Sequence, residues 1–265
     1  MKKLQVFLFF GIFFTFNSQA RIFTVSNVTG SVAMFTSAQQ AVDSAKVGDT
    51  VFVHVSSTSY GSVSIKRKIV LLGEGGKPNY SGASSLFGGI SIDTLSGVPV
   101  SGTIVLGIAS GGLIIADKIK GVTIKNCYIN STTNLFGTGH IIVNNILTYP
   151  YVYLGSNITF SNNIVSYSIL AGTNCVIGNC IFIFDGVATI GSPTFSNLFN
   201  CTIVNNLIIH SGKTIGAGIG SSFSKNIQAA TDLPAGNFTG KQPVNIFSES
   251  TISASMTAPQ ITTAA

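Results

Sequence analysis

From about residue 120 onward, hydrophobic and polar positions recur at intervals near 20 residues. Each repeat contains a six-residue unit in which apolar residues flank a polar pair, and the units occupy residues 124–129, 142–147, 160–165, 177–182, 203–208 and 223–228. The first residues of these pairs are 18, 18, 17, 26 and 20 positions apart. Such a repeat with apolar residues at every second position predicts a β-solenoid, because the fixed leucine spacing of leucine-rich repeats is missing.

The second position of each pair is predicted to form a ladder along the solenoid axis. It is occupied in turn by Cys127, Asn145, Asn163, Cys180, Asn206 and Asn226. Equivalent positions of stacked coils lie about 4.8 Å apart, so an Asn amide can bond to the coils above and below while tolerating a left-handed backbone. A ligand site lined by Asn is the alternative, and the regular column favours the structural ladder.

Two further columns are expected to face the core, because they alternate with the polar pair. Two residues before each pair stand Ile124, Ile142, Phe160, Ile177, Ile203 and Phe223; four before stand Val122, His140, Ile158, Cys175, Cys201 and Ser221. His140 therefore replaces an apolar residue. A buried, hydrogen-bonded histidine is favoured over a catalytic one, since no carboxylate or cysteine partner accompanies it in sequence.

An amphipathic segment N-terminal to these repeats predicts a helix over residues 35–46. Its apolar positions are 35, 38, 41, 42 and 45, and Thr36 or Ser37 is placed as the N-cap. Gly48 and Asp49 are expected to end the helix before a strand over residues 50–55. A helix here would cover the open end of the first coil and protect unpaired strand edges.

These features resemble the secreted bacterial right-handed parallel β-helix proteins of the pectate-lyase-like superfold, of an uncharacterised Bacteroidetes type. The repeated unit carries the resemblance, together with the helix and the segments 60–66 and 69–73. It covers about residues 22–228 and implies an all-β, right-handed parallel β-helix with a short N-terminal capping helix. Residues 229–265 resemble the stretch that follows the last coil, without the usual closing segment.

The first 20 residues are predicted to be a signal peptide. Lys2 and Lys3 precede a mostly apolar run over residues 4–16, and small residues occupy the −3 and −1 positions before a cleavage site after Ala20. The run is too short for a membrane anchor, which needs about 20 residues. The remaining chain is therefore expected to be secreted or at the cell surface, with the periplasm as an alternative.

Composition excludes further classes of protein. The chain is 45% hydrophobic and only 8% charged, which argues against a disordered chain. Its formal charge of +6 falls to +4 without Lys2 and Lys3. This excess is too small to predict nucleic-acid binding, which needs clustered basic residues.

Enzymes of the resembled family use clustered acids and a basic residue, often with calcium. After the signal peptide this chain has eight carboxylates, no two closer than six residues. Only Asp93 and Asp117 could stack on adjacent coils, with Lys118 or Lys120 nearby, and they are weak catalytic candidates. No cofactor or metal site is predicted.

One aromatic column could bind a ligand: Tyr149, Tyr167 and Phe184, continued by His210. If the rings face outward, they would form a platform for a glycan; if they face inward, they would stack in the core. The inward orientation is the favoured interpretation, because apolar residues precede each ring. His54, in the first strand, offers no better site.

The four cysteines do not suggest two disulfides, in spite of their even number. Cys127 and Cys180 share a column but lie three coils apart, about 14 Å, which is too far for a bridge. Cys175 and Cys201 occupy adjacent coils and are expected to be stacked thiols rather than a bridge.

The sequence therefore predicts three regions: a signal peptide (1–20), a capped β-helix (21–228) and an irregular closing or trailing segment (229–265). The favoured function is an exported, non-catalytic scaffold or surface-interaction protein that binds a polysaccharide or cell-surface glycan. The alternative is a lyase or hydrolase of an acidic polysaccharide that uses Asp93 and Asp117.

Overall fold

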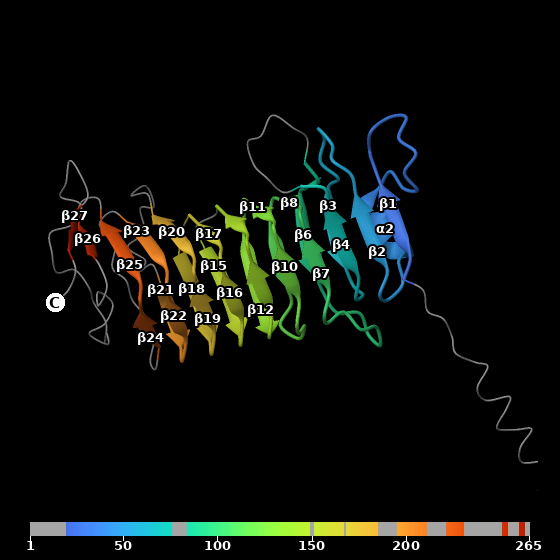
Figure 1. The fold of residues 1–265 in the computed structure, drawn as a ribbon. Helices are drawn as coiled ribbons and strands as arrows, with labels where there is room; N and C mark the ends of the chain where they lie inside the picture. The colour runs from blue at the N-terminus through green and yellow to red at the C-terminus, as the bar shows by residue number, and fades with distance from the viewer. Residues whose placement is uncertain are drawn as a thin grey trace, which may run out of the picture.

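The computed structural model describes residues 20–75, 84–148, 151–166, 168–184, 195–210, 221–230, 251–253 and 260–262. Within them the chain is a right-handed parallel β-helix, whose strands stack side by side along one axis (Figure 1). This confirms the expected fold. Of the signal peptide predicted over residues 1–20, all but Ala20 lies outside the described residues.

Three sheets form the walls, and the chain visits them in the order A, B, C in each regular coil. Sheet A has ten strands: β1 (Ile22–Val25), β2 (Thr50–Val53), β4 (Val70–Gly73), β7 (Ile104–Leu106), β10 (Thr123–Lys125), β13 (Ile141–Val143), β16 (Thr159–Ser161), β19 (Val176–Gly178), β22 (Thr202–Val204) and β24 (Ser222–Ser224).

Sheet B also has ten strands, and only its last pair is antiparallel: β5 (Leu86–Phe87), β8 (Ala109–Ser110), β11 (Tyr128–Ile129), β14 (Ile146–Leu147), β17 (Ile164–Val165), β20 (Ile181–Phe184), β23 (Leu207–His210), β25 (Ile227–Ala230), β26 (Thr251–Ser253) and β27 (Gln260–Thr262). Sheet C has seven: β3 (Ser62–Ile65), β6 (Gly89–Ile92), β9 (Leu113–Ile115), β12 (Thr133–Thr138), β15 (Tyr151–Ser156), β18 (Ser168–Thr173) and β21 (Phe195–Phe199).

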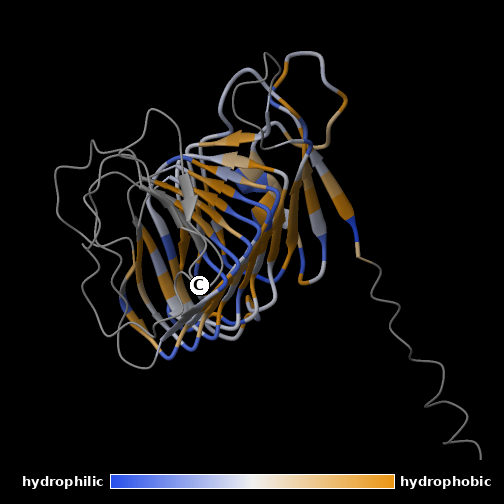
Figure 2. Ribbon diagram, turned by 60° about the vertical axis from the view of Figure 1, so that its left-hand side comes forward, coloured by the Kyte–Doolittle hydropathy of each residue, from blue (hydrophilic) through white to orange (hydrophobic). Residues whose placement is uncertain are grey.

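Strand register stacks equivalent apolar residues into columns that fill the interior. In sheet A the central inner column is Val51, Leu71, Val105, Ile124, Ile142, Phe160, Ile177 and Ile203, all buried. Figure 2 shows hydrophobic positions alternating with hydrophilic ones along the strands. Each fully buried Val, Leu or Ile contributes roughly 1.5–3 kcal/mol, so these columns are the main source of stability.

The corner between sheets A and B explains the polar pairs. Its first residue has a left-handed backbone in every repeat, at Asn126, Asn144, Asn162, Asn179, Asn205 and Lys225. Asn adopts this region more readily than most residues, because its short side chain bonds locally. The second residue of each pair points inward. We expected one Asn both to adopt the left-handed backbone and to form the ladder, but the first residue of the pair adopts that backbone and the second forms the ladder.

The helix is shorter than the predicted 35–46. α2 spans Ala38–Ser44, and Ser37 is its N-cap, accepting a hydrogen bond from the Gln40 N–H. Phe35 instead pairs with Val25 of β1, and the Lys46 N–H bonds to the Asp49 carboxylate at 2.7 Å, which holds the chain beyond Ala45 out of the helix. The strand expected over residues 50–55 ends at Val53, because the Val55 N–H bonds to the Glu74 carboxylate.

Candidate functional site

The last four strands of sheet C, from β12 to β21, kink near their carboxyl ends. Between β12 and β15 the register shifts after Leu135, and Gly137 has a φ of 87°. In the later coils Ala171 and Asn197 occupy equivalent positions with left-handed φ values of 62° and 52°. A left-handed alanine is uncommon, and such bulges re-aim neighbouring side chains. We call residues 136–138, 154–156, 171–173 and 197–199 the kink.

Polar side chains of the inner column bond to the carbonyl groups of the kink from inside. His140 Nε2 lies 2.6 Å from Phe136 O, and Ser221 Oγ donates to Leu198 O at 2.9 Å. The thiols of Cys175 and Cys201 donate to Gly155 O and Gly172 O, each at 3.6 Å. Four of the six residues in this column carry donors, because the kink turns carbonyl groups toward the core, where they need partners.

His140 has a structural role as one of the side chains that bond to the kink from inside. It is completely buried, and its Nδ1 accepts a hydrogen bond from the Val122 N–H at 3.0 Å. Its Nε2 therefore carries the proton and donates to the Phe136 carbonyl, which makes the ring neutral. Burial lowers its pKa below the usual 6.5, against the opposing effect of the Phe136 carbonyl. This agrees with the expectation of a buried, hydrogen-bonded histidine.

On the outer side the kink forms a groove of about 550 Å³, which we call the kink groove. Three hydroxyl residues, Thr138, Ser156 and Thr173, line it in register along the axis, about 4.8 Å apart. Phe199 continues this row and is 44% exposed. Phe136, which is half-buried, also lines the groove but lies in β12, three coils from Phe199. The groove also contains the Asn197 amide and the Asp117 carboxylate.

The two acids named from the sequence lie in adjacent coils, one position out of register. Asp93 accepts a hydrogen bond from the neighbouring Thr94 N–H at 2.6 Å, and strand pairing places it next to Ala116, so Asp117 lies one residue further on. Asp117 lines the kink groove, whereas Asp93, Lys118 and Lys120 are not among its lining residues. Within the described ranges, no group of three His, Cys, Asp or Glu residues could hold a metal ion.

The ladder residues bond mainly to the backbone of the preceding coil. Asn145 Oδ1 accepts from the Cys127 N–H at 2.9 Å, and its Nδ2 donates to Ile124 O at 3.1 Å. Asn163, Asn206 and Asn226 repeat the donation to a carbonyl of the coil before. Direct amide contacts join only adjacent Asn residues, as at Asn145 Nδ2 and Asn163 Oδ1, 3.0 Å apart. All six side chains are buried, so this column offers no ligand site.

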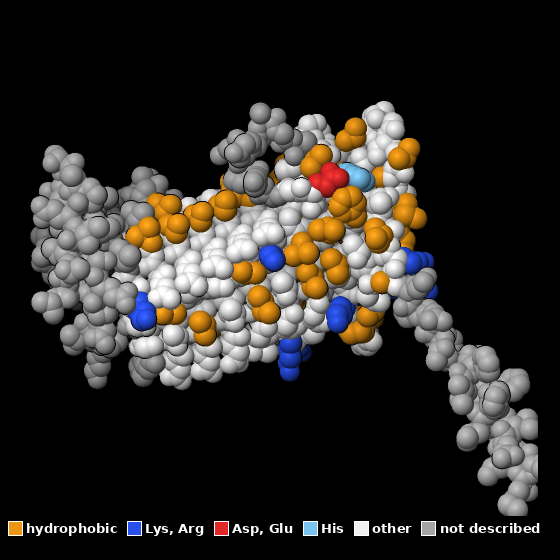
Figure 3. Space-filling view, in the orientation of Figure 1, with side chains coloured by type: hydrophobic (Ala, Val, Ile, Leu, Met, Phe, Trp, Pro, Cys, Tyr) orange, Lys and Arg blue, Asp and Glu red, His pale blue; other side chains and the backbone are white. Residues whose placement is uncertain are grey.

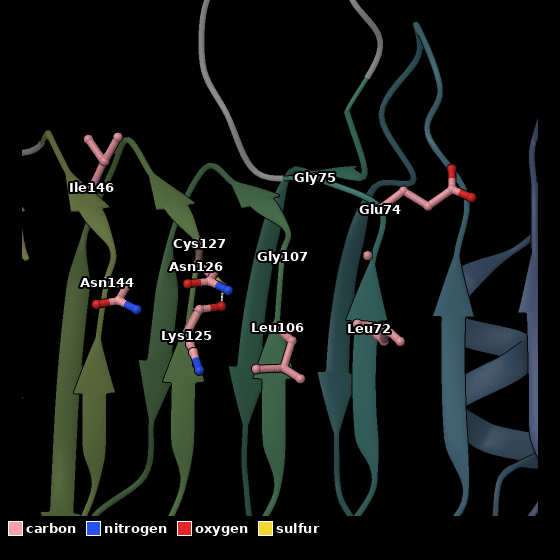
Figure 4. A pocket seen from close by; sticks show the side chains of 11 residues that line it. Leu72, Glu74, Gly75, Leu106, Gly107, Lys125, Asn126, Cys127, Asn144 and Ile146 are labelled. Atoms are coloured by element: carbon pink, nitrogen blue, oxygen red, sulfur yellow. Dashed lines mark hydrogen bonds between the residues drawn. The ribbon is translucent and has the colours of Figure 1, made fainter.

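A second hollow of about 550 Å³ crosses strands β4, β7 and β10 on the outside of sheet A (Figure 4). Leu72 and Leu106 form its floor, and the amides of Asn126 and Asn144 lie at its edge. Figure 3 shows that hydrophobic side chains gather over the N-terminal coils on this face, with few charged ones. The hollow has no aromatic side chain in its lining, unlike the kink groove.

Sequence reasoning missed one ion pair near this hollow. His54 Nδ1 lies 2.9 Å from Glu74 Oε1, and Glu74 Oε2 accepts from the Val55 N–H at 2.9 Å. The two residues stand 20 positions apart, and only the stacking of β2 on β4 joins them. Because both oxygens of Glu74 are engaged, the pair fixes the turn after β2.

The predicted aromatic column cannot be placed. Tyr149 and Tyr167 lie outside the described residues, and of Phe184 and His210 only the backbone pairing of β20 with β23 is described.

The cysteines agree with their prediction: all four are free and buried, and the Cys175 N–H donates to Cys201 Sγ at 3.4 Å.

Comparison of the chain with protein-family models, curated proteins and solved structures found no match. Among the helices of the described residues, none is both long and apolar enough to cross a membrane.

Proposed function

We propose that the protein is an exported, non-catalytic β-helix scaffold that binds a neutral glycan chain in the kink groove. The observation that carries this proposal is the lining of the groove, which combines a row of three hydroxyl groups with Phe136, Phe199 and an amide. Exposed aromatic rings offer apolar faces, while hydroxyl and amide groups orient a ligand by hydrogen bonds. A hydroxyl-rich polymer lying along the axis can use both.

The charge of the groove favours a neutral chain over an acidic one. Asp117 is the one charged residue among the described residues of the lining, and a polymer of uronic acids would meet its carboxylate without a basic partner. Glycoside hydrolysis ordinarily needs a second carboxylate about 5–10 Å from the first. Among the described residues no other carboxylate lines the groove, and Asp93 in the adjacent coil lies outside the lining, which supports binding rather than cleavage.

Export rests on the sequence. The charged start, the apolar run and the small residues before Arg21 support a signal peptide, and the resemblance to secreted bacterial β-helix proteins of the pectate-lyase-like superfold agrees with it.

The test is binding of the purified protein to neutral polysaccharides and to polymers of uronic acids, with product formation followed in parallel. We expect binding to a neutral polymer and no cleavage, and Phe199→Ala should weaken binding about tenfold, the loss of about 1.4 kcal/mol. Val176→Ala removes an apolar side chain of matching exposure, 45%, on the outside of sheet A and should leave binding unchanged.

Two results would overturn the proposal. Equal binding by the Phe199→Ala variant would remove the kink groove as the site. Depolymerisation of an acidic polysaccharide that disappears in Asp117→Asn would instead support the alternative, a lyase or hydrolase.

A further inference from the structure

Two thiols lie directly beneath the kink groove in adjacent coils. Cys175 and Cys201 each precede a strand of sheet A, and these strands, β19 and β22, pair in register from Val176 and Thr202. The Thr202 N–H donates to Cys175 O at 2.8 Å, and the Cys175 N–H donates to Cys201 Sγ at 3.4 Å. Parallel neighbours have Cα atoms about 4.8 Å apart, inside the range that a disulfide requires.

The same thiols bond to the backbone of the groove. Cys175 Sγ donates to Thr173 O at 3.4 Å or Gly155 O at 3.6 Å, and Cys201 Sγ to Phe199 O at 3.4 Å or Gly172 O at 3.6 Å. Thr173, Gly155, Phe199 and Gly172 all line the groove. A chemical change at the sulfur atoms therefore removes donors from the groove wall.

We propose that Cys175 and Cys201 are an oxidisable pair, which a small-molecule disulfide converts to an intramolecular disulfide that alters the kink groove. Both thiols are buried, so the reaction begins when the groove wall opens locally. The Cys201 thiolate then attacks the oxidant, forms a mixed disulfide and releases one small thiol. The Cys175 thiolate then attacks Cys201 Sγ, releases the second small thiol and closes the bond. Both protein thiol protons end on the released thiols, and the oxidant disulfide is reduced as the pair is oxidised.

Two observations indicate which thiol reacts first and that the disulfide is readily reversed. Contact with Cys175 lowers the pKa of Cys201 and raises that of Cys175, and the Cys175 N–H that bonds to Cys201 Sγ also favours the Cys201 thiolate, so Cys201 is the first nucleophile. Side chains of parallel neighbours leave the same face nearly parallel, about 4.8 Å apart, which is wider than the β-carbon spacing of a relaxed disulfide. Such a bond is readily reduced.

Cys127 and Cys180 provide the matched control. Both are buried in the ladder column, and burial raises the pKa of each thiol to about 11. They belong to coils that are three apart along sheet B, so they cannot bridge within the fold.

The experiment exposes the full chain to oxidised glutathione under native conditions, followed by peptide mapping without reduction. We expect a 175–201 cross-link that dithiothreitol reverses, no cross-link in Cys201→Ser, and an unchanged one in a Cys127→Ala/Cys180→Ala variant. Free thiols at both positions after oxidation, or a link that involves Cys127 or Cys180, would overturn the proposal.

The effect on the groove rests on the proposed glycan binding and has its own readout. Loss of two weak donors from the wall should reduce glycan affinity about threefold in the cross-linked protein. Equal affinity of the reduced and cross-linked forms would refute the coupling to the groove. Absence of glycan binding in both forms would refute the proposed function, while the cross-link is judged by the mapping alone.

Discussion

The side-chain amide of Gln39 pairs with both backbone groups of Ser64: its Oε1 accepts from the Ser64 N–H at 2.8 Å, and its Nε2 donates to Ser64 O at 3.2 Å. Ser64 lies in β3, the first strand of sheet C, and no strand of the described residues lies beside its outer edge. One glutamine of α2 therefore substitutes for a neighbouring strand and blocks the edge against pairing with another chain.

Replacing Gln39 by Ala should lower the free energy of unfolding by about 1–2 kcal/mol, because two backbone groups lose their partner but become accessible to water. Urea denaturation followed by circular dichroism measures the change. Gln40→Ala is the control, since Gln40 lies in the same helix with an exposed side chain. An equal effect of both variants would mean that the glutamine contributes helix propensity alone.

The other sheets are closed at the same end by different means. The segment before β3 covers the edge of sheet B, where the Tyr60 N–H donates to Leu86 O at 2.8 Å. Phe35 extends sheet A beyond β1 through its bridge to Val25. The sequence predicted that a helix would cover this end, but it could not show that one side chain completes a sheet.

The Asn ladder should be far more sensitive to substitution than the exposed Asn residues beside it. Asn145→Leu preserves the approximate volume but leaves the buried Cys127 N–H and the Ile124 carbonyl without their partner. We expect a loss of about 2–4 kcal/mol in the free energy of unfolding, from two unsatisfied buried groups.

The neighbouring Asn144→Gly variant is the control for this prediction. Asn144 is exposed and has a φ of 58°, a conformation that glycine adopts without strain. Its effect should stay within about 0.5 kcal/mol. A comparable loss in both variants would show that the corner, rather than the ladder, carries the stability.

Cys180 interrupts the ladder, and Asn at this position should strengthen it. Cys180 Sγ accepts from the Asn163 N–H at 3.4 Å and donates to Gly178 O at 3.2 Å or weakly toward Phe160 O at 3.7 Å. An amide would make both bonds with stronger groups, so Cys180→Asn should raise the free energy of unfolding by about 0.5–1 kcal/mol. Cys180→Ala removes both bonds and should lower it by about 1 kcal/mol or more. We expect thermal stability to decrease in the order Asn, Cys, Ala at position 180. A Cys180→Asn variant that is less stable than the unchanged protein would contradict the prediction.

The sequence predicted the solenoid and its columns because equivalent positions repeat, and stacking converts a repeat into a column. The kink groove could not be found in this way. Ala171 has a left-handed backbone although alanine gives no signal for it, and the bulge in β12 is a shift of register between coils rather than a residue type. The donors in the inner column, His140 above all, were visible in the sequence, but the Phe136 partner of His140 lies in the preceding strand of sheet C.

Burial makes His140 a source of pH dependence. Its pKa is lowered in the folded state, because burial disfavours the charged ring, whereas the unfolded chain has the ordinary value of 6.5. At pH values below 6.5 the unfolded state therefore binds a proton that the folded state does not, and the free energy of unfolding falls as the pH falls toward the folded-state pKa. Above 6.5 both states are neutral at this residue, and its contribution becomes constant.

Measuring urea denaturation between about pH 5 and pH 8 tests this assignment. Protonation of His140 would place a donor opposite the Val122 N–H, so the acidic loss of stability should disappear in His140→Gln, whose amide can still accept from Val122 and donate to Phe136. His54→Gln is the matched control, because His54 is paired with Glu74 near the surface and should leave the acidic loss in place. An acidic loss that persists unchanged in His140→Gln would refute the neutral, doubly bonded ring as its cause.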